Sequence, residues 1–272
     1  MRKIALLLAA CGLAAALGGC GVGVPHSKQV LEMEAEDVLV LPDGQSVDCW
    51  REYHTFEGTD THLPSGWVDY CLEDGTLLLR EEDLFAPNLP ETVPEQARQA
   101  IQAHFLRQGR LYSAESLLPG AYAEYQADPE GFENWSVWQD SRVTALAERV
   151  VYVVTDINLP LGGREQTSRQ IGTAFDRSTG EQLSLWSLFT VPEEKAKEAL
   201  LAYLAPEDPR RAEMLEQLTE EMVVIAEDHY SICYPLGSLP GEEQSCRLSS
   251  ALPEGLLHPW AVPIGPEQEA QS

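Results

Sequence analysis

The stretch Val150-Val151-Tyr152-Val153-Val154 has the strongest preference for β-structure in this chain of 272 residues. Its β-branched residues suit a pleated strand, and it lacks the alternation of apolar and polar residues that marks a strand with one wet face. We therefore expect a central strand that is buried on both faces. Such a strand needs pairing partners on both edges and apolar cover on both sides.

Two regions, one before and one after this strand, share the order of their local signals. Each runs from a turn that contains glycine through an apolar segment to Thr-Val-Pro-Glu and a helix. Asp74-Gly75 and Thr179-Gly180 supply the turns, because glycine adopts the positive φ that tight turns need. The Thr-Val-Pro-Glu tetrads that start at Thr92 and Thr190 predict capping boxes at the helix starts.

The parallel order continues beyond these helices. A second helix is expected at 113–126 in the first half and at 208–220 in the second. Each half then closes with a hairpin, which turns near Asp140 and near Asp228. The recurring order favours a duplication, although independent use of the same turn and capping residues is the alternative. We expect an α+β fold of two similar halves, each an antiparallel sheet packed with two helices.

The N-terminal residues predict secretion and lipid attachment. Met1-Arg2-Lys3 is a basic start, and the apolar core at 4–17 is shorter than the about 20 residues of a bilayer span. Leu17-Gly18-Gly19-Cys20 then resembles the bacterial lipobox. We expect a signal peptide at 1–19, a lipid on Cys20, and a protein anchored at the extracytoplasmic face of the cell membrane. An ordinary signal peptide followed by an incidental cysteine is the alternative.

The rest of the chain divides into four predicted parts. We expect a tether at 20–37, a first α+β half at 38–147, a second α+β half at 148–262 and a flexible tail at 263–272. The tether begins with Gly, Val and Pro and then becomes acidic, which is the composition of a linker.

The charge of the chain limits its partners. There are 44 Asp and Glu residues against 18 Lys and Arg residues, which gives a net charge of −26 at pH 7. Such a surface repels nucleic acid and anionic lipid headgroups, and it attracts basic peptides and proteins at low salt. The alternative is that the acidity serves solubility alone.

Four cysteines remain after the signal peptide and the lipid site are set aside. They are Cys49, Cys71, Cys233 and Cys246, an even number in a compartment that permits disulfides. Cys49–Cys71 and Cys233–Cys246 each bracket a strand–loop–strand stretch, so we expect these two pairings. Four free thiols are the alternative. No paired Cys-x-x-Cys is present, so we expect no zinc site.

A series of short motifs runs from 162 to 189. It consists of a glycine pair, a Phe-Asp pair, a Thr-Gly turn, two alternating leucines and a Leu-Phe pair: Gly162-Gly163, Phe175-Asp176, Thr179-Gly180, Leu183, Leu185 and Leu188-Phe189. This order resembles the RsiV-like extracytoplasmic domain, found in a lysozyme-sensing anti-sigma factor and in bacterial lipoproteins of unknown role. The resemblance covers about 148–262 and implies an α+β domain with lysozyme as a candidate ligand. The chain departs from it at Arg164-Glu165, where family members often have Ala-His.

Four residues are candidates for ligand binding. Trp135 and Trp138 lie three apart on an expected strand, so their side chains face opposite sides, and one of them is available as an exposed anchor. Core positions for both tryptophans are the alternative. His229 and Tyr230 belong to the C-terminal hairpin, which in relatives is more apolar and aromatic.

The sequence contains none of the common catalytic signatures. It has no Gly-x-Ser-x-Gly, no phosphate loop and no His-Glu-x-x-His, and its histidines are scattered. We expect no catalytic residue, no metal and no cofactor. The predicted function is a non-enzymatic surface lipoprotein that binds a cationic extracellular ligand, with lysozyme or a basic peptide as candidates. A hydrolase of wall glycan and a structural envelope protein are the alternatives.

Overall fold

A computed structural model describes the parts of the chain that carry regular structure, namely residues 28–56, 65–83, 86–161, 164–235, 237–240 and 246–264. The predicted signal peptide, the lipid site at Cys20 and residues 265–272 of the predicted tail lie outside them. Pro263 and Ile264, the first two residues of that tail, are held by pairing with Ala147 and Leu146, so the tail was predicted to begin too early. Strand β1 begins at Lys28, so the predicted tether ends earlier than Asp37. No helix in the described ranges is long and apolar enough to cross a membrane.

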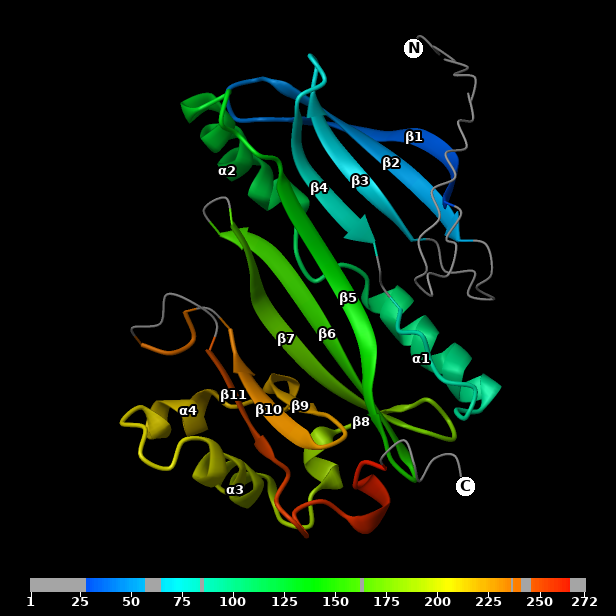
Figure 1. Cartoon of the computed structure of the whole chain (residues 1–272), viewed down its shortest axis with the longest axis vertical. Coiled ribbons are helices and arrows are strands. Elements are labelled where there is room, and N and C mark those ends of the chain that lie inside the picture. The colour runs from blue at the N-terminus through cyan, green and yellow to red at the C-terminus, as the bar shows by residue number, and fades with distance from the viewer. Residues whose placement is uncertain are drawn as a thin grey trace, which may run out of the picture.

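An eight-stranded sheet forms the centre of the fold, with its strands in sequence order (Figure 1). They are β1 (Lys28–Val40), β2 (Ser46–Phe56), β3 (Ser65–Leu72), β4 (Leu77–Asp83), β5 (Trp135–Leu146), β6 (Val150–Leu161), β7 (Arg164–Asp176) and β8 (Gln182–Leu183). All neighbours are antiparallel except β4 and β5, which run parallel. A parallel pair needs a long crossover, and α1 (Glu95–Gln108) and α2 (Ala114–Ala127) provide it.

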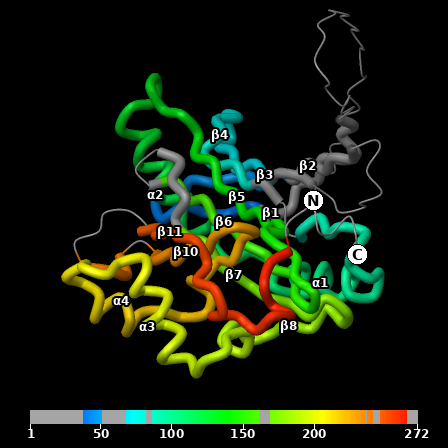
Figure 2. Tube along the Cα trace, turned by 60° about the horizontal axis from the view of Figure 1, so that its bottom comes forward, coloured from blue at the N-terminus to red at the C-terminus, as the bar shows by residue number. Residues whose placement is uncertain are grey.

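A second, smaller layer follows β8. It contains η1 (Leu185–Leu188), α3 (Glu193–Leu204), α4 (Arg211–Gln217), η2 (Glu220–Met222), β9 (Val223–Ile225), β10 (His229–Tyr234), β11 (Cys246–Ala251) and η3 (Pro259–Ala261). The last three strands form a separate sheet in the order β11-β10-β9. Figure 2 shows α3 and α4 on the side of the large sheet opposite α1.

Strand β6 is central and buried on both faces, which confirms the prediction made from its five apolar residues. Val151 and Val153 pack with Phe105 of α1 in one core. Tyr152 belongs to the core on the other face, and its hydroxyl donates to the carbonyl of Ala261 at 2.6 Å. Burial of this strand therefore joins helix α1 to the smaller layer through the sheet.

The two predicted halves share one sheet instead of having a sheet each. The first hairpin, expected near Asp140, does not exist, because β5 runs unbroken through that position. Its polar residues find partners inside the sheet, as in the contact of Ser141 Oγ with Thr155 Oγ1 at 2.8 Å. The second hairpin is confirmed, since the N–H of Ala226 donates to the carbonyl of His229 and closes β9 onto β10.

The turns were predicted correctly, but the capping boxes were not. Gly75 and Gly180 both have positive φ, at 87° and 75°. Helices α1 and α3 begin after Pro94 and Pro192, and no side chain caps either start. Thr190 instead donates its hydroxyl to the carbonyl of Gly255 at 2.9 Å, so it ties the start of α3 to the C-terminal segment.

The predicted disulfide between Cys49 and Cys71 is wrong, and no disulfide occurs in the described part of the chain. Cys49 stands opposite Tyr70, while Cys71 stands opposite Asp48. Opposed residues share a face of a sheet and successive residues alternate. The two cysteines therefore point to opposite faces, although they lie on adjacent strands.

The same one-residue offset prevents the second predicted disulfide. Cys233 stands opposite Arg247, and Cys246 stands opposite Tyr234. A disulfide requires Cβ atoms about 3.5–4.5 Å apart that point toward each other. Both cysteine pairs were placed in the correct hairpins, but in a register that excludes the bond.

Candidate functional site

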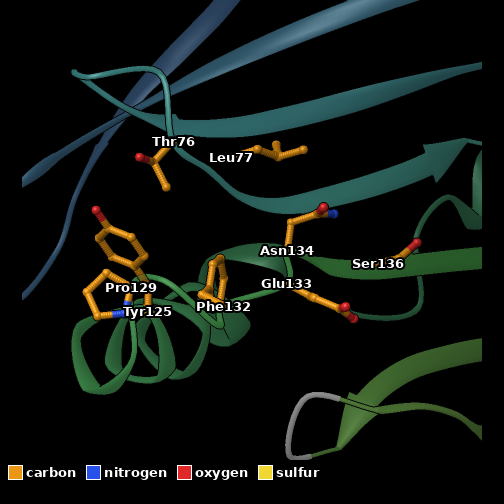
Figure 3. Close-up of a pocket in the computed structure, with 8 residues that line it drawn as sticks. All are labelled: Thr76, Leu77, Tyr125, Pro129, Phe132, Glu133, Asn134 and Ser136. Carbon is orange, nitrogen blue, oxygen red and sulfur yellow. The ribbon is translucent and has the colours of Figure 1, made fainter.

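A pocket of about 700 Å³ opens between the β3–β4 turn and the loop that leads from α2 to β5 (Figure 3). Its walls come from β4, α2, the loop and the start of β5: Thr76, Leu77, Tyr125, Pro129, Phe132, Glu133, Asn134 and Ser136. Residues about fifty positions apart in the sequence thus meet at one site.

Local interactions explain how the loop forms the aromatic wall of the pocket. Helix α2 ends at Ala127, and the next residue, Asp128, accepts a hydrogen bond from the N–H of Gly131 at 3.1 Å. This turn folds the chain back, so that Phe132 meets Tyr125 edge to face with ring centroids 5.5 Å apart. Tyr122 continues the aromatic row on α2, with its ring stacked 6.4 Å from that of Tyr125.

Trp135 lies next to this wall and holds α2 on the sheet. Its indole N–H donates to Glu124 at 3.0 Å. A Cβ at Gly120 would come within 2.7 Å of the Trp135 ring, so the glycine lets the helix approach the ring closely. Trp135 is therefore a packing residue that supports the pocket and not an exposed anchor.

Acidic side chains gather around the pocket. We call the β1–β2 turn (41–45), the β3–β4 turn (73–76) and residues 111–141 together the acidic end. Its acidic residues are Asp43, Glu73, Asp74, Glu115, Glu124, Asp128, Glu130, Glu133 and Asp140. No Lys, Arg or His occurs in these three ranges, all of which the structure describes. The potential here is therefore negative. The nearest basic residues in sequence are Arg110 and Arg142, which flank residues 111–141, and Arg142 acts on Asp140.

Two titrating groups at this end respond to their surroundings. Hydrogen bonds from Thr76, including its N–H at 2.9 Å, lower the pKa of Asp74, so this carboxylate keeps its charge at mildly acid pH. Partial burial and the neighbouring Asp43 raise the pKa of Tyr122. Asp43 thus links the β1–β2 turn to α2 at the acidic end.

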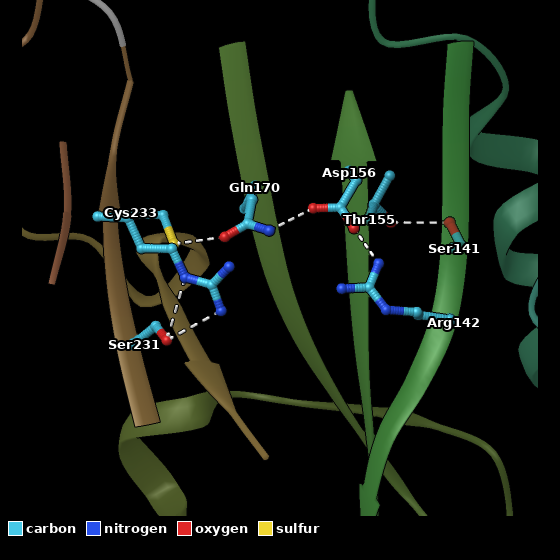
Figure 4. A network of polar contacts seen from close by, with 8 residues as sticks. Ser141, Arg142, Thr155, Asp156, Gln170, Ser231 and Cys233 are labelled. Carbon is cyan, nitrogen blue, oxygen red and sulfur yellow. Dashed lines mark hydrogen bonds and ion pairs between the residues drawn. The ribbon is translucent and has the colours of Figure 1, made fainter. Parts of the chain in front are cut away.

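A second polar site lies between the large sheet and the small one (Figure 4). Asp156 of β6 accepts hydrogen bonds from Arg142 of β5 and from Gln170 of β7. Gln170 in turn accepts from the thiol of Cys233 on β10, at 2.8 Å. Burial raises the pKa of Cys233 to about 12, so this thiol stays protonated and serves as a donor. We call these residues the intersheet network.

A third polar group is fully buried under α2. Glu81 of β4 accepts a hydrogen bond from the hydroxyl of Tyr70 at 2.8 Å and pairs with Arg110 at 3.3 Å. Gln139 of β5 fixes the same α1–α2 loop by donating to the carbonyl of Gly109 at 3.0 Å. These contacts hold the crossover in place and are part of the scaffold.

The structure does not bring the four sequence-predicted ligand residues together. Trp138 faces away from Trp135, as the spacing predicted, and is half-buried on the side of the small sheet. Tyr230 is a core residue, fully buried, whose hydroxyl donates to the carbonyl of Leu200 at 2.7 Å. His229 is half-buried and contacts Asp228 at 2.7 Å. Sequence reasoning missed Tyr125 and the other pocket residues.

The pocket offers carboxylate and aromatic groups, and metal binding has no support in the part of the chain that the structure describes. Within it, no group of three or more His, Cys, Asp or Glu side chains is placed to hold a metal ion.

The chain is an α+β protein built on one large curled sheet. No family model matches it, and neither does any curated protein. Its neighbours among solved structures are DUF3298 family proteins. One, from Bacteroides fragilis, has a TM-score of 0.43 and 13% identity, over 68% of this chain and 87% of that one. Another, from Pseudomonas aeruginosa, has a TM-score of 0.38 and 16% identity, over 90% of this chain and 100% of that one. At these TM-scores, neither likeness supports an argument about function.

Proposed function

We propose that this chain is a lipid-anchored, extracytoplasmic binding protein whose acidic end captures a cationic protein or peptide without catalysis. One observation carries the proposal, namely that the pocket of Tyr125, Phe132 and Glu133 lies where acidic side chains gather without a basic one. A concave site in a one-sign field concentrates ligands of the opposite sign and speeds their encounter.

The chemistry of the pocket suits a Lys or Arg side chain. The rings of Tyr125 and Phe132 attract a cation through their π faces, and the carboxylate of Glu133 supplies an ion pair. The pocket volume accommodates one or two side chains of a larger partner. Carboxylates farther out on the acidic end then steer the partner but add little affinity each, because they are exposed.

The resemblance to RsiV-like domains and the duplication of the two halves remain proposals. Each half has a glycine turn, a helix that starts after a proline, and a second helix, with Pro94 and Pro192 as the helix N-caps. This shared order supports the duplication, while the resemblance is supported by the motifs at 162–189. If the resemblance extends to ligands, lysozyme is the first cationic protein to test.

Calorimetric titration of the full chain with lysozyme and with a lysine-rich peptide tests the proposal, at low and at physiological salt. We expect saturable binding that weakens with salt. Phe132→Ala is expected to weaken it about tenfold, since it removes the cation–π contact and the wall of the pocket.

A matched pair of double variants provides the control. Glu130→Gln with Glu133→Gln neutralises the rim of the pocket, and we expect it to weaken binding about threefold to fivefold at low salt. Glu213→Gln with Glu216→Gln removes the same charge from exposed positions on α4 and is expected to leave affinity unchanged. Equal effects of the two variants, or no binding at either salt, would refute the proposal.

A further inference from the structure

The polar groups that line the pocket at the acidic end mainly offer acceptors. None of the eight lining residues is basic, and Glu133 contributes a carboxylate. The hydroxyl of Thr76 donates to Asp74, so its oxygen meets a ligand as an acceptor. The side-chain nitrogen of Asn134 donates to the carbonyl of Trp135 at 3.4 Å, which leaves the amide oxygen to accept. A ligand that matches this pocket must therefore be rich in donors.

The acceptors lie toward two ends of the pocket, with aromatic rings between them. Figure 3 shows Thr76 at one end and Asn134 and Glu133 toward the other. Phe132 lies between these ends, and its ring stands at 73° to that of Tyr125, with 5.5 Å between the ring centroids. Two rings in this edge-to-face arrangement form a corner that is bounded by a face of each. A cation in this corner has aromatic faces beside it and acceptors at either end.

Guanidinium and ammonium groups meet such a pocket differently. A guanidinium is flat, so it stacks on a ring and keeps its five N–H donors in its own plane, from which they reach acceptors on several sides. The ammonium of lysine carries its three donors on one nitrogen, so it cannot serve both ends of the pocket at once. A guanidinium is also less strongly hydrated, so moving it from water onto an aromatic surface costs less free energy.

We infer that the pocket selects arginine over lysine, so that the partner is a peptide or protein segment with an exposed arginine. The inference rests on the proposed function, because it names which cation of a basic partner enters the pocket. The guanidinium lies against the rings of Tyr125 and Phe132 and donates to Glu133 and Asn134. Carboxylates elsewhere at the acidic end do not distinguish the two side chains, since at a distance each acts as a single positive charge.

Calorimetric titration of the full chain with three peptides of equal charge tests the inference, at low and at physiological salt. The first peptide is a capped series of Gly-Arg repeats, the second replaces each arginine by lysine, and the third replaces it by symmetric dimethylarginine. At physiological salt, which screens the long-range attraction, we expect the arginine peptide to bind about threefold to tenfold more tightly than the lysine peptide. Dimethylation keeps the charge but removes donors, so we expect the third peptide to bind no better than the lysine peptide.

Variants of the pocket locate the preference for arginine. Phe132→Leu removes a ring but keeps an apolar side chain, so we expect the ratio of the two affinities to fall to about twofold or less. Asn134→Ala removes an acceptor at an exposed position and is expected to weaken binding of the arginine peptide about twofold to threefold, with binding of the lysine peptide unchanged. Tyr203→Leu, at a tyrosine of α3 that is 62% exposed, is the matched control and leaves the ratio as in the wild type.

The outcomes separate this inference from the proposed function. Equal affinities of the wild type for the arginine and lysine peptides would overturn the preference and leave the proposed function standing. Binding of neither peptide at either salt concentration would overturn both. The inference also fails if the dimethylated peptide binds as tightly as the arginine peptide, because the donors would then play no part. It fails as well if Phe132→Leu and Asn134→Ala both keep the full preference, since the arginine would then bind elsewhere.

Discussion

Thiol chemistry follows from the register of two hairpins. Cys49 and Cys233 are buried, and Cys71 and Cys246 are half-buried, each pair split between two faces of its sheet. Burial raises the pKa values of Cys233, to about 12, and of Cys71. Thiolates react much faster than thiols, so Cys71 and Cys233 are expected to react slowly with thiol reagents at neutral pH.

We predict that the unfolded chain has the same number of reactive thiols with and without prior reduction. Ellman's reagent in concentrated guanidinium measures this number, and the native protein, which reacts much more slowly, is the control. If reduction releases two or four additional thiols, the protein contains disulfides and the register of at least one hairpin differs from the one described.

His104 makes stability depend on pH. Its ring packs edge-on against Phe105 and Phe175, at centroid distances of 5.2 Å and 5.1 Å. Burial and, secondarily, the nearby Arg107 lower the pKa of His104. The unfolded chain therefore binds a proton more readily than the folded one, so this contribution to stability is present above about pH 6.5 and is lost as pH falls through the lowered value.

We predict that His104→Leu reduces the dependence of the free energy of unfolding on pH. Denaturant unfolding between pH 5 and 8 is expected to show the wild type losing more free energy of unfolding than the variant as the pH falls. His229→Gln changes a histidine that lies beside Asp228 outside the core, and it serves as the control. Parallel curves for the wild type and His104→Leu would rule out this role of His104.

At the scale of elements, local signals that the backbone itself requires could be predicted from the sequence. The central strand, the turn glycines Gly75 and Gly180, and the helix expected at 113–126 all follow from residues adjacent in the chain. The β9–β10 hairpin was predicted correctly for the same reason.

Elements that depend on distant partners could not be predicted. The polar residues Asp140 and Ser141 resemble a turn in sequence, but the contacts of Ser141 with Thr155 and of Arg142 with Asp156 pair β5 with β6 and keep it continuous. Cysteine spacing likewise reveals which hairpin a residue belongs to and not its register, since a shift of one residue reverses the face.

Gly172 sets how closely the two sheets approach. A Cβ at this position of β7 would come within 1.9 Å of the backbone carbonyl oxygen of Val223 on β9. Backbone cannot move aside as a side chain does, so we predict that Gly172→Ala lowers the free energy of unfolding by about 3 kcal/mol or more. Denaturant unfolding measures the loss.

Gly120→Ala is the matched comparison. Its Cβ would meet the far edge of the Trp135 ring at 2.7 Å, which can shift, and alanine favours the helix by about 1 kcal/mol. We expect a clearly smaller loss than for Gly172→Ala. Similar losses for the two variants would show that the close contact at Val223 does not control the approach of the sheets.

At the scale of the molecule, the acidic character was evident from composition, but the pocket was not. Charge can be counted along the sequence, and the absence of basic residues at 111–141 is a signal that sequence reading can find. The pocket arises only when the β3–β4 turn, which contains Thr76, and the loop after α2, which contains Phe132, line one site. This arrangement depends on the crossover between the parallel strands β4 and β5, and no local sequence pattern predicts that crossover.

The uneven charge has a consequence for stability as well as for binding. With a net charge of −26 and no basic residue at the acidic end, the folded state holds like charges close together. Salt screens this repulsion, since the Debye length falls from about 30 Å at 0.01 M to about 8 Å at 0.15 M. We therefore predict that raising NaCl over this range increases the melting temperature of the full chain by about 2 °C, which corresponds to roughly 1 kcal/mol of relieved repulsion.

The double variants locate this effect. Glu130→Gln with Glu133→Gln removes two charges from the acidic end, so it is expected to raise the melting temperature at low salt and to reduce the response to NaCl. Glu213→Gln with Glu216→Gln removes two charges from α4, where Arg210 and Arg211 lie nearby in sequence, and is expected to change the response less. Thermal melts of the wild type and the two double variants at both salt concentrations show whether the repulsion is concentrated at the acidic end or spread over the whole surface. Equal responses would mean that the repulsion is spread over the whole surface, and then the acidic end would hold no stored electrostatic energy for a cationic partner to release.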